Sequence, residues 1–239
     1  MRLNVPRLDS QIVQGFAAFD TPEISDRLNR LYAVDSEIVC MSGGPRRTVG
    51  LACTVRVYPG DNLMVHKALD VARPGDVVVV AAGGGRSNAV LGDIISTKAK
   101  HRGIAGFVVD GLVRDLPAIQ DLDFAVYAKG TTPIGPLHRG PGEINYPIAC
   151  GGVVTNPGDV VVADSAGVVV IPHQIAPELL AQLRANAAGQ AAYLALVQQG
   201  QFDNSWVDTH LALHSCPVDR DDEPVAIAAG EPGFVSGER

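Results

Sequence analysis

The chain has 239 residues, of which 46% are hydrophobic and 5% aromatic, and its formal net charge is −7 at pH 7. This length suffices for a domain with a sizeable core, and the 26 glycines among many small aliphatic residues favour an α/β fold over a helical bundle. The acidic balance, without any Lys/Arg run longer than two residues, argues against direct nucleic-acid binding, and no apolar stretch is long enough for a membrane span.

The first half of the chain alternates between predicted helices and strands. The predicted elements are a helix over 21–31, a strand over 50–57, a helix over 62–71, a strand over 77–82, a helix over 93–102, a strand over 104–110, a helix over 116–122 and a strand over 124–128. The glycines at 83–85 are expected to end the strand before a loop over 86–92. The β-α-β-α-β series predicts a parallel sheet with helical crossovers.

The pattern changes after residue 130. Short apolar runs separated by Pro-Gly-Asp and Asp-Ser-Ala-Gly turns predict antiparallel hairpins. A long helix rich in Ala, Gln and Leu is expected over 177–199. Residues 1–215 are therefore expected to form a single domain, and the Pro-, Gly- and acid-rich residues 216–239 an irregular tail.

The cysteines and the N-terminal segment bear on the compartment. Cys40, Cys53, Cys150 and Cys216 are widely spaced and form no CxxC pair, so neither a zinc site nor disulfides are expected. The N-terminal segment has no long apolar run of the secretory kind. We therefore expect a cytoplasmic protein, with Cys150 as a small core residue.

Two junctions between a predicted strand and a predicted helix carry the candidate chemistry, because ligands of open α/β sheets bind beyond the carboxyl ends of the strands. The first runs from the glycines at 83–85 to Gly92 and Asp93, where the free N–H groups of Ile94 and Ile95 would attract a carboxylate. The second is the segment 110–115 (DGLVRD). There the guanidinium of an Arg can bind an anionic substrate while a carboxylate holds a hard metal ion.

Each of these residues also has a purely structural interpretation. Asp93 and Asp115 both precede predicted helices, where Asp is a favoured N-cap, and the pattern alone gives capping and function about equal weight. Arg114 alone is typical of a surface ion pair. The three glycines match neither a phosphate-binding loop nor a dinucleotide-binding fingerprint.

Three longer strings resemble the RraA-like family over roughly residues 20 to 200. They are GDNLMVHKALDVARPGDVVVV, NAVLGDIISTKAKHRGIAGFVVDGLVRD and GGVVTNPGDVVVADSAGVVVIP. Most specific is an Asp followed, after a gap of twenty residues, by Arg-Asp, which Asp93, Arg114 and Asp115 match. The family includes 4-hydroxy-4-methyl-2-oxoglutarate and 4-carboxy-4-hydroxy-2-oxoadipate aldolases as well as regulators of RNase E. The segment 142–152 (GEINYPIACGG) is closer to the aldolases.

The resemblance implies a role for each matching residue. Arg114 would bind the carboxylate and keto oxygen of a small anionic 2-oxo acid, with the amides of Ile94 and Ile95 completing the carboxylate site beside Gly92. Asp115 would hold Mg²⁺ or Mn²⁺, partly through water. Asp93 would orient or deprotonate a water on that metal. The expected reaction is retro-aldol cleavage to pyruvate and an oxo acid, with decarboxylation of oxaloacetate as a side activity.

The resemblance also implies a compact β/β/α fold like that of phosphohistidine swivelling domains, ending in a C-terminal helix. The family's assembly would be a homotrimer or homohexamer with active sites between subunits. In the family's aldolases the neighbouring subunit's C-terminal helix provides an acidic residue, whereas Gln190 stands at that position here. Either the register of that helix is shifted here, or metal handling or substrate range is altered. Two rival functions also stay open: a non-catalytic protein like the RNase E regulators, or a decarboxylase or hydratase of another 2-oxo acid.

Other candidate residues are given structural interpretations. A Schiff-base route would need a desolvated lysine, and Lys98 and Lys100 lie in the charged stretch KAKHR. His66 is interpreted as a partly buried structural histidine. His138 is expected in a solvated loop.

Overall fold

The computed structural model describes residues 1–44 and 46–217, and it divides the chain into two compact units, Met1–Ala188 and Gly189–Arg239. The helices are α1 Ser10–Gly15, a 3₁₀ turn Phe16–Ala18, α2 Thr21–Arg27, α3 Leu63–Val71, α4 Asp93–His101, α5 Leu116–Asp121, α6 Ala176–Gln198 and α7 Ser205–Leu213. The strands are β1 Val39–Cys40, β2 Thr48–Arg56, β3 Val77–Leu91, β4 Gly106–Val113, β5 Ala125–Thr131, β6 Glu143–Ile144, β7 Ile148–Cys150, β8 Val153–Thr155, β9 Val160–Asp164 and β10 Gly167–Ile171. The predicted α/β class and C-terminal helix are confirmed.

The first unit is built on a mixed sheet in the order β1-β5-β4-β3-β2-β9-β10, with β6 paired to β2. Strands β2 to β5 run parallel, as the β-α-β-α-β series predicts. The hairpins predicted after residue 130 are confirmed, because β7 pairs with β8 and β9 with β10, both antiparallel.

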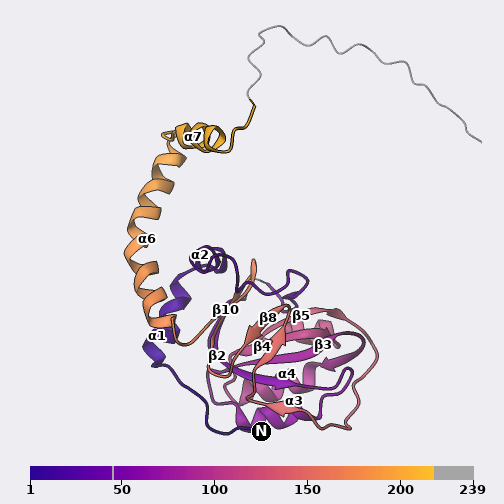
Figure 1. Ribbon diagram of the computed structural model, residues 1–239. Helices are drawn as coiled ribbons and strands as arrows, with labels where there is room; N and C mark the ends of the chain where they lie inside the picture. The colour runs from indigo at the N-terminus through magenta and orange to yellow at the C-terminus, as the bar shows by residue number, and fades with distance from the viewer. Residues whose placement is uncertain (45, 218–239) are drawn as a thin grey trace, which may run out of the picture. The chain divides into compact units, whose positions relative to one another are not determined.

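The apolar run that begins β3 is buried on both faces of the sheet. Val78 and Val80 join a cluster with α3, α4 and α5, whereas Val77 and Val79 join one with β7, β9 and β10. Period-two alternation of a strand therefore places a continuous Val run in two cores at once. Helices α3 and α4 accordingly lie together on one side of the sheet (Figure 1).

Two boundary predictions are wrong. The helix predicted over 21–31 ends at Arg27, and Asn29 and Arg30 beyond it have positive φ values of 53° and 62°. The glycines at 83–85 do not end β3, which continues through the expected loop 86–92 as far as Leu91. Its pairing with β4 shifts register between Ala81 and Leu91, and Gly83 and Gly84 have positive φ values of 66° and 64°. The glycines thus accommodate an irregular strand instead of a turn, since they adopt this backbone without a Cβ clash.

The second unit begins within α6 and includes α7. Gln190 is exposed on α6, and α7 has no buried residue. No helix in the described part of the chain has the length and apolar character needed to cross a membrane. The predicted tail over 216–239 lies almost wholly outside the described residues, so the predicted domain boundary at 215 stays a prediction.

Candidate active site

The ends of β3 and β4 bring the two predicted junctions side by side. Leu91 pairs with Val113 as the last residues of adjacent parallel strands, and the Arg114 amide donates to the Leu91 carbonyl at 3.0 Å. The residues that follow each strand therefore emerge next to each other. Segments that are twenty residues apart in the sequence therefore lie side by side at one edge of the sheet.

The first junction is the N-terminus of α4. Gly92 occupies the N-cap position, and Asp93 is the first helical residue, with its Oδ1 accepting from the Ile94 amide at 2.6 Å. Ser96 Oγ donates to the Gly92 carbonyl at 2.8 Å, which fixes the turn. The first amides of a helix have no intrahelical acceptor and carry partial positive charge, so this end of α4 attracts an anion.

The second junction is held by the unusual backbone of Asp115. Asp115 adopts the left-handed conformation, with φ 57° and ψ 40°, and occupies the N-cap position of α5 without a side-chain capping bond. Asp115 is thus at the N-cap position, but the interpretation of its side chain as a helix cap is wrong. Its carboxylate instead lies 3.2 Å from Arg114 Nε. A non-glycine residue in this region is uncommon, and such strain is concentrated at functional sites.

A glycine on each side allows this close packing. A Cβ added at Gly92 would lie 2.3 Å from Asp115 Oδ2 and 2.9 Å from Arg114 Cγ. A Cβ at Gly135 would lie 2.7 Å from an outer nitrogen of the Arg114 guanidinium. The guanidinium and the carboxylate are thus seated against bare backbone, and no larger residue fits at Gly92 without displacing them.

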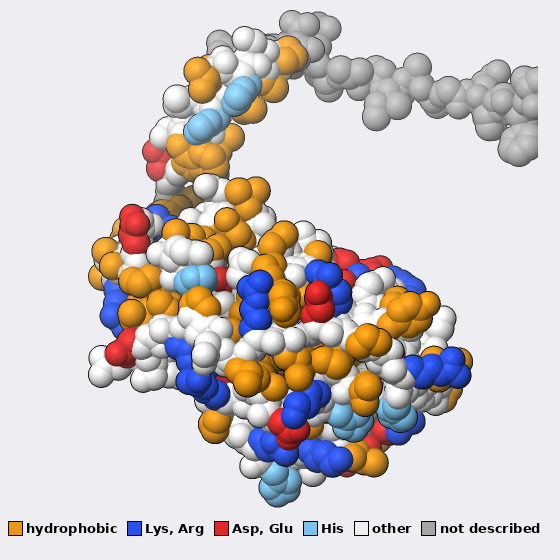
Figure 2. Space-filling model, turned by 60° about the horizontal axis from the view of Figure 1, so that its bottom comes forward, with side chains coloured by type: hydrophobic (Ala, Val, Ile, Leu, Met, Phe, Trp, Pro, Cys, Tyr) orange, Lys and Arg blue, Asp and Glu red, His pale blue; other side chains and the backbone are white. Residues whose placement is uncertain are grey.

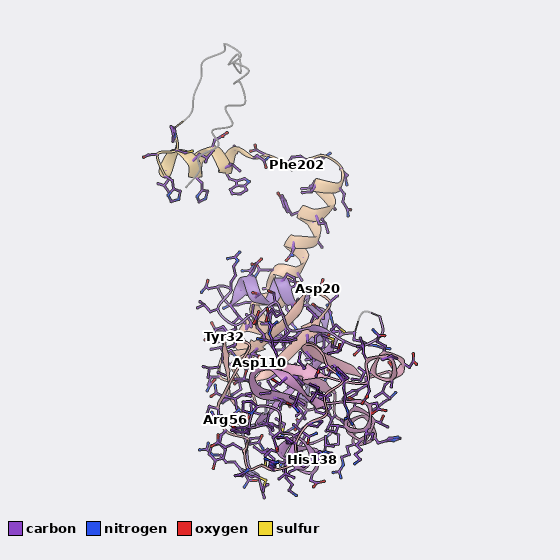
Figure 3. All side chains as sticks on the ribbon, turned by 90° about the vertical axis from the view of Figure 1, so that its right-hand side faces the viewer. Asp20, Tyr32, Arg56, Asp110, His138 and Phe202 are labelled. Atoms are coloured by element: carbon purple, nitrogen blue, oxygen red, sulfur yellow. The ribbon has the colours of Figure 1, made fainter. Side chains whose placement is uncertain are left out.

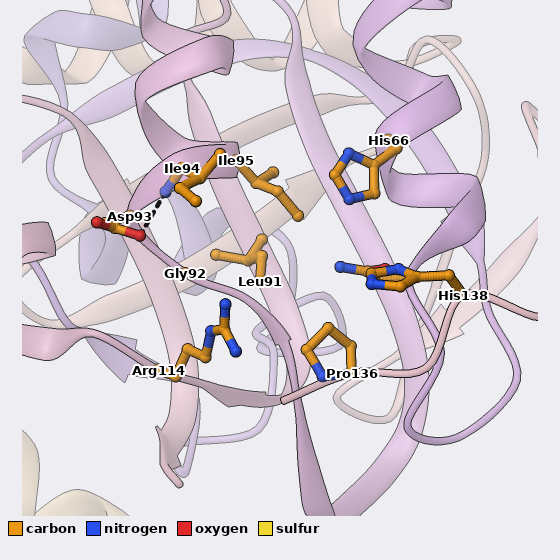
Figure 4. Close-up of a pocket in the computed structure, with 10 residues that line it drawn as sticks. His66, Leu91, Gly92, Asp93, Ile94, Ile95, Arg114, Pro136 and His138 are labelled. Carbon is orange, nitrogen blue, oxygen red and sulfur yellow. Dashed lines mark hydrogen bonds between the residues drawn. The ribbon is translucent and has the colours of Figure 1, made fainter. Parts of the chain in front are cut away.

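These residues surround a pocket of about 260 Å³ (Figure 4). Its lining includes five of the six predicted site residues, namely Gly92, Asp93, Ile94, Ile95 and Arg114. Asp115 is not in the lining and lies beside it, in contact with Arg114. The structure therefore brings all six predicted residues together at one site, while their individual roles stay predictions.

The opposite wall of the pocket contains residues that the sequence analysis did not assign to a site. His66, on α3, and His138 face the pocket with their rings 5.8 Å apart (Figure 4). His138 Nδ1 is 2.7 Å from the side-chain oxygen of the buried Asn62. Burial, together with the positive charges of Lys98 and His138, lowers the pKa of His66, which favours its neutral form. His138 lies in an exposed loop, as expected, and this loop also lines the pocket.

Asp61 explains how a distant loop reaches this wall. Its buried carboxylate accepts from the amides of Leu63, Arg139 and Gly140, while the Leu137 amide donates to the Gly60 carbonyl at 2.7 Å. Burial alone would raise the pKa of Asp61, but the three amides lower it. This anchoring depends on tertiary contacts, so no local signal could have identified His138. For His66 the sequence does contain a signal, because Asn62 and His66 are four residues apart, a spacing that places two side chains on the same face of a helix.

The donor set suits a hard cation that keeps much of its water. In the described residues no three His, Cys, Asp or Glu side chains cluster as a metal site, and Asp115 is the carboxylate packed against Gly92 and Arg114. Mg²⁺ commonly binds through one or two carboxylates with water and substrate oxygens completing its shell. Asp115 therefore fits Mg²⁺ or Mn²⁺, and a closed zinc site of His and Cys does not fit.

Asp110, at the start of the second junction, belongs to a different cluster of charged residues. Lys129 on β5 lies 3.0 Å from both Asp110 and Asp35, and Cys150 is fully buried nearby. Asp110 and His138 lie well apart in Figure 3, so this cluster is separate from the pocket. Burial alone would lower the pKa of Lys129, but the two carboxylates raise it, which favours its charged form over the neutral amine that a Schiff base needs. Burial raises the pKa of the Cys150 thiol to about 12, as suits a core residue.

Comparison with known proteins identifies the family of this chain. The model of the RraA-like family, described as Aldolase/RraA, matches residues 21–170. A protein of Halalkalibacterium halodurans named "Putative 4-hydroxy-4-methyl-2-oxoglutarate aldolase" is 46% identical over 157 residues, which are 66% of this chain and 74% of that protein.

Two solved structures carry other names. Streptomyces coelicolor RraAS2, described as an unusual member of the RNase ES inhibitor RraA protein family, has a TM-score of 0.71 and 30% identity, covering 80% of this chain and 99% of its own. A Geobacillus kaustophilus chain described as S-adenosylmethionine: 2-dimethylmenaquinone methyltransferase has a TM-score of 0.60 and 35% identity, covering 64% and 95%. Because these names differ, the fold alone does not establish an activity, which must be argued from the residues of the pocket.

Proposed function

This chain belongs to the RraA-like family, and from that premise we propose that it is a metal-dependent carbon–carbon lyase. Its substrate would be a small 4-hydroxy-2-oxo acid, cleaved between C3 and C4 into pyruvate and a second oxo acid. One observation carries the proposal: the Arg114 guanidinium and the N-terminus of α4 face one pocket, with the Asp115 carboxylate packed beside them. The name of the Halalkalibacterium halodurans relative supports the same reaction class.

Binding of the 2-oxo acid follows from the charges of the pocket. Arg114 presents a planar cation that can bind a carboxylate oxygen and the neighbouring keto oxygen together. The Ile95 amide at the positive end of α4 adds a second donor, and the Ile94 amide adds a third once Asp93 turns toward the substrate. The substrate is thereby fixed with its C3–C4 bond directed across the pocket, toward His66 and His138.

The chemistry then needs charge stabilisation and a proton acceptor. A metal held by Asp115 would supply a Lewis acid that stabilises negative charge on the 2-oxo group. Asp93 accepts the proton of the C4 hydroxyl, directly or through a water molecule, as that carbon becomes a carbonyl. The electrons of the broken C3–C4 bond form an enolate next to the Arg114 cation, and protonation at C3 completes pyruvate. Oxaloacetate would lose CO₂ through the same enolate.

Assembly and metal choice belong to the same proposal. Mg²⁺ or Mn²⁺ suits the Asp115 carboxylate, with water and substrate oxygens completing the metal's shell. We propose a homotrimer or homohexamer, supported by the large apolar side chains that α6 and α7 expose, including Tyr193, Leu194 and Trp206. Gln190 on α6 would then contribute an amide where an acid is expected.

The direct test is pyruvate release from 4-carboxy-4-hydroxy-2-oxoadipate, first with Mg²⁺ and then with EDTA. We expect release that EDTA abolishes, and a loss of about 10²- to 10³-fold in kcat/KM for Arg114→Ala, because a preorganised cation at developing charge contributes on this scale. Arg56→Ala, which removes an exposed arginine paired with Glu143, is the matched control and should keep full activity. Turnover that is unchanged in Arg114→Ala would sink the proposal.

A non-catalytic regulator is the second candidate, favoured by the likeness to the RNase ES inhibitor family member from Streptomyces coelicolor. A protein that acts by surface contact has no need for a guanidinium and a carboxylate packed against Gly92. Folded protein that releases no pyruvate with Mg²⁺ or Mn²⁺ would favour this candidate, or a lyase for another 2-oxo acid.

A further inference from the structure

A second hollow lies next to the pocket, between helices α3 and α4. It has a volume of about 430 Å³. It is lined by His66, Leu69, Asp70, Thr97, Lys98, His101 and Arg102. His66 lines both this α3–α4 groove and the active-site pocket, so the two spaces are neighbours on either side of one residue. Figure 2, in which the α3 side of Figure 1 is turned forward, shows His, Lys and Arg side chains gathered in the lower part of the view.

The lining follows one stripe on each helix. On α4, Ile94 faces the pocket, and Thr97, Lys98 and His101 follow it at spacings of three, four and seven residues. Residues at these spacings share one face of a helix. On α3, Asn62, His66 and Leu69 repeat the pattern. The stripe on α4 therefore extends about 10 Å from the anion-binding end of the helix into the groove, at 1.5 Å per residue.

The groove has more positive than negative charge. Its one carboxylate, Asp70, is already paired with Arg102 at 2.8 Å and with Lys67 at 3.2 Å. Arg102 also donates to the Leu69 carbonyl at 2.8 Å. Within the part of the chain that the structure describes, the exposed Lys98 and His101 have no ion pair or side-chain hydrogen bond. These two side chains are free to bind an anion.

A basic last turn also stabilises the C-terminal end of a helix, whatever its neighbours are. Lys100 also belongs to the last turn of α4, but it does not line the groove. It is two residues away from Lys98 and therefore on another face of the helix. Comparing Lys98 with Lys100 therefore separates a ligand site from a helix-end effect.

We propose that the α3–α4 groove binds the second carboxylate of the substrate, through Lys98 and His101. This inference rests on the proposed lyase function. With its 2-oxo carboxylate at Arg114 and the N-terminus of α4, the substrate extends past His66 toward these two cations. A 2-oxo acid without a second carboxylate is then bound more weakly, because it cannot reach these two cations.

Two ligands that cannot be cleaved test this directly: pyruvate, which has only the 2-oxo carboxylate, and 2-oxoglutarate, which adds a second. Isothermal titration calorimetry of the full chain with Mg²⁺ should show tighter binding of 2-oxoglutarate by wild type. In Lys98→Ala/His101→Ala we expect the Kd of 2-oxoglutarate to rise about 10-fold, equivalent to 1.4 kcal/mol. The Kd of pyruvate should stay within about twofold of wild type, as should both values in Lys100→Ala.

The outcomes separate the two proposals. An unchanged affinity for 2-oxoglutarate in the double variant overturns the groove assignment while leaving the lyase proposal intact. Equal losses for both ligands, or the same loss in Lys100→Ala, also overturn it, because the effect would then not follow the second carboxylate. If wild type binds neither ligand with Mg²⁺, both proposals fall together.

Discussion

Replacing Gly92 with alanine changes one methyl group at the centre of the proposed site. The backbone there is extended, with φ −147° and ψ −155°, so alanine adopts it without strain. The new Cβ would lie 2.3 Å from Asp115 Oδ2. Ordinary contact requires about 3.4 Å or more, so the carboxylate must move by roughly 1 Å, and Arg114 Cγ must also shift. Asp115 is exposed, so its side chain can move at little cost to the fold.

Activity should be far more sensitive than stability to this displacement. A misplacement of about 1 Å costs on the order of 10²-fold in rate, or about 2.7 kcal/mol of transition-state stabilisation. We expect kcat/KM for pyruvate release to fall by that amount and the Mn²⁺ concentration at half-maximal activity to rise about 10-fold. The thermal midpoint should change by only a few degrees.

The control is Arg56→Ala, which removes an exposed arginine paired with Glu143 outside the pocket lining. It should leave kcat/KM and the metal requirement unchanged. Wild-type kcat/KM and an unchanged Mn²⁺ requirement in Gly92→Ala would refute the reasoning, since they would mean that the position of Asp115 does not matter to the reaction. Circular dichroism would detect a variant that unfolds, and the measurements would then be repeated at a lower temperature at which the variant is folded.

Two further predictions concern charges outside the reaction. Lys129→Met should lower the free energy of unfolding in urea by about 2 kcal/mol or more, because it leaves the buried Asp110 carboxylate without its cation, whereas Lys67→Met removes an exposed pair and should change little. Equal effects of the two substitutions would contradict this. The lowered pKa of His66 means that the unfolded chain binds its proton more readily, so stability should decline as pH falls from about 6.5 toward that lowered value. Thermal midpoints between about pH 7.5 and 5.5 should show a smaller decline in His66→Gln than in wild type, and identical slopes would exclude a contribution from this histidine.

The parallel core could be predicted from the sequence because its signal is local. The run from Val77 to Ala82 can be buried on both faces only in an interior strand, and helical patterns on either side require crossovers. The continuation of β3 to Leu91 could not be predicted this way. Glycines at 83–85 are typical of a turn, and only pairing with β4 holds the irregular strand that they form.

Half of the site could be predicted for a similar reason. Asp93 and Arg114 each follow a predicted strand, and adjacent parallel strands end at the same edge of a sheet. The histidine wall is different, because His138 reaches the pocket only through backbone bonds to Gly60 and the carboxylate of Asp61. Those contacts join segments nearly eighty residues apart, and no periodicity in either segment reports them.

The local backbone at Asp115 helps to choose between a lyase and a surface-binding regulator. A left-handed residue with a Cβ costs on the order of 1 kcal/mol, and neither a side-chain cap nor a buried contact of Asp115 offsets it here. Gly92 adds to this cost, because a glycine gives the unfolded chain more conformational entropy to lose than an alanine would. Alanine cannot replace it, however, since its Cβ would collide with the Asp115 carboxylate. Both features hold one carboxylate against one guanidinium at the mouth of a pocket. A protein that acts through its outer surface gains nothing from that arrangement, whereas a metal-dependent lyase requires it, so this loop should lose function on substitution well before the fold is lost.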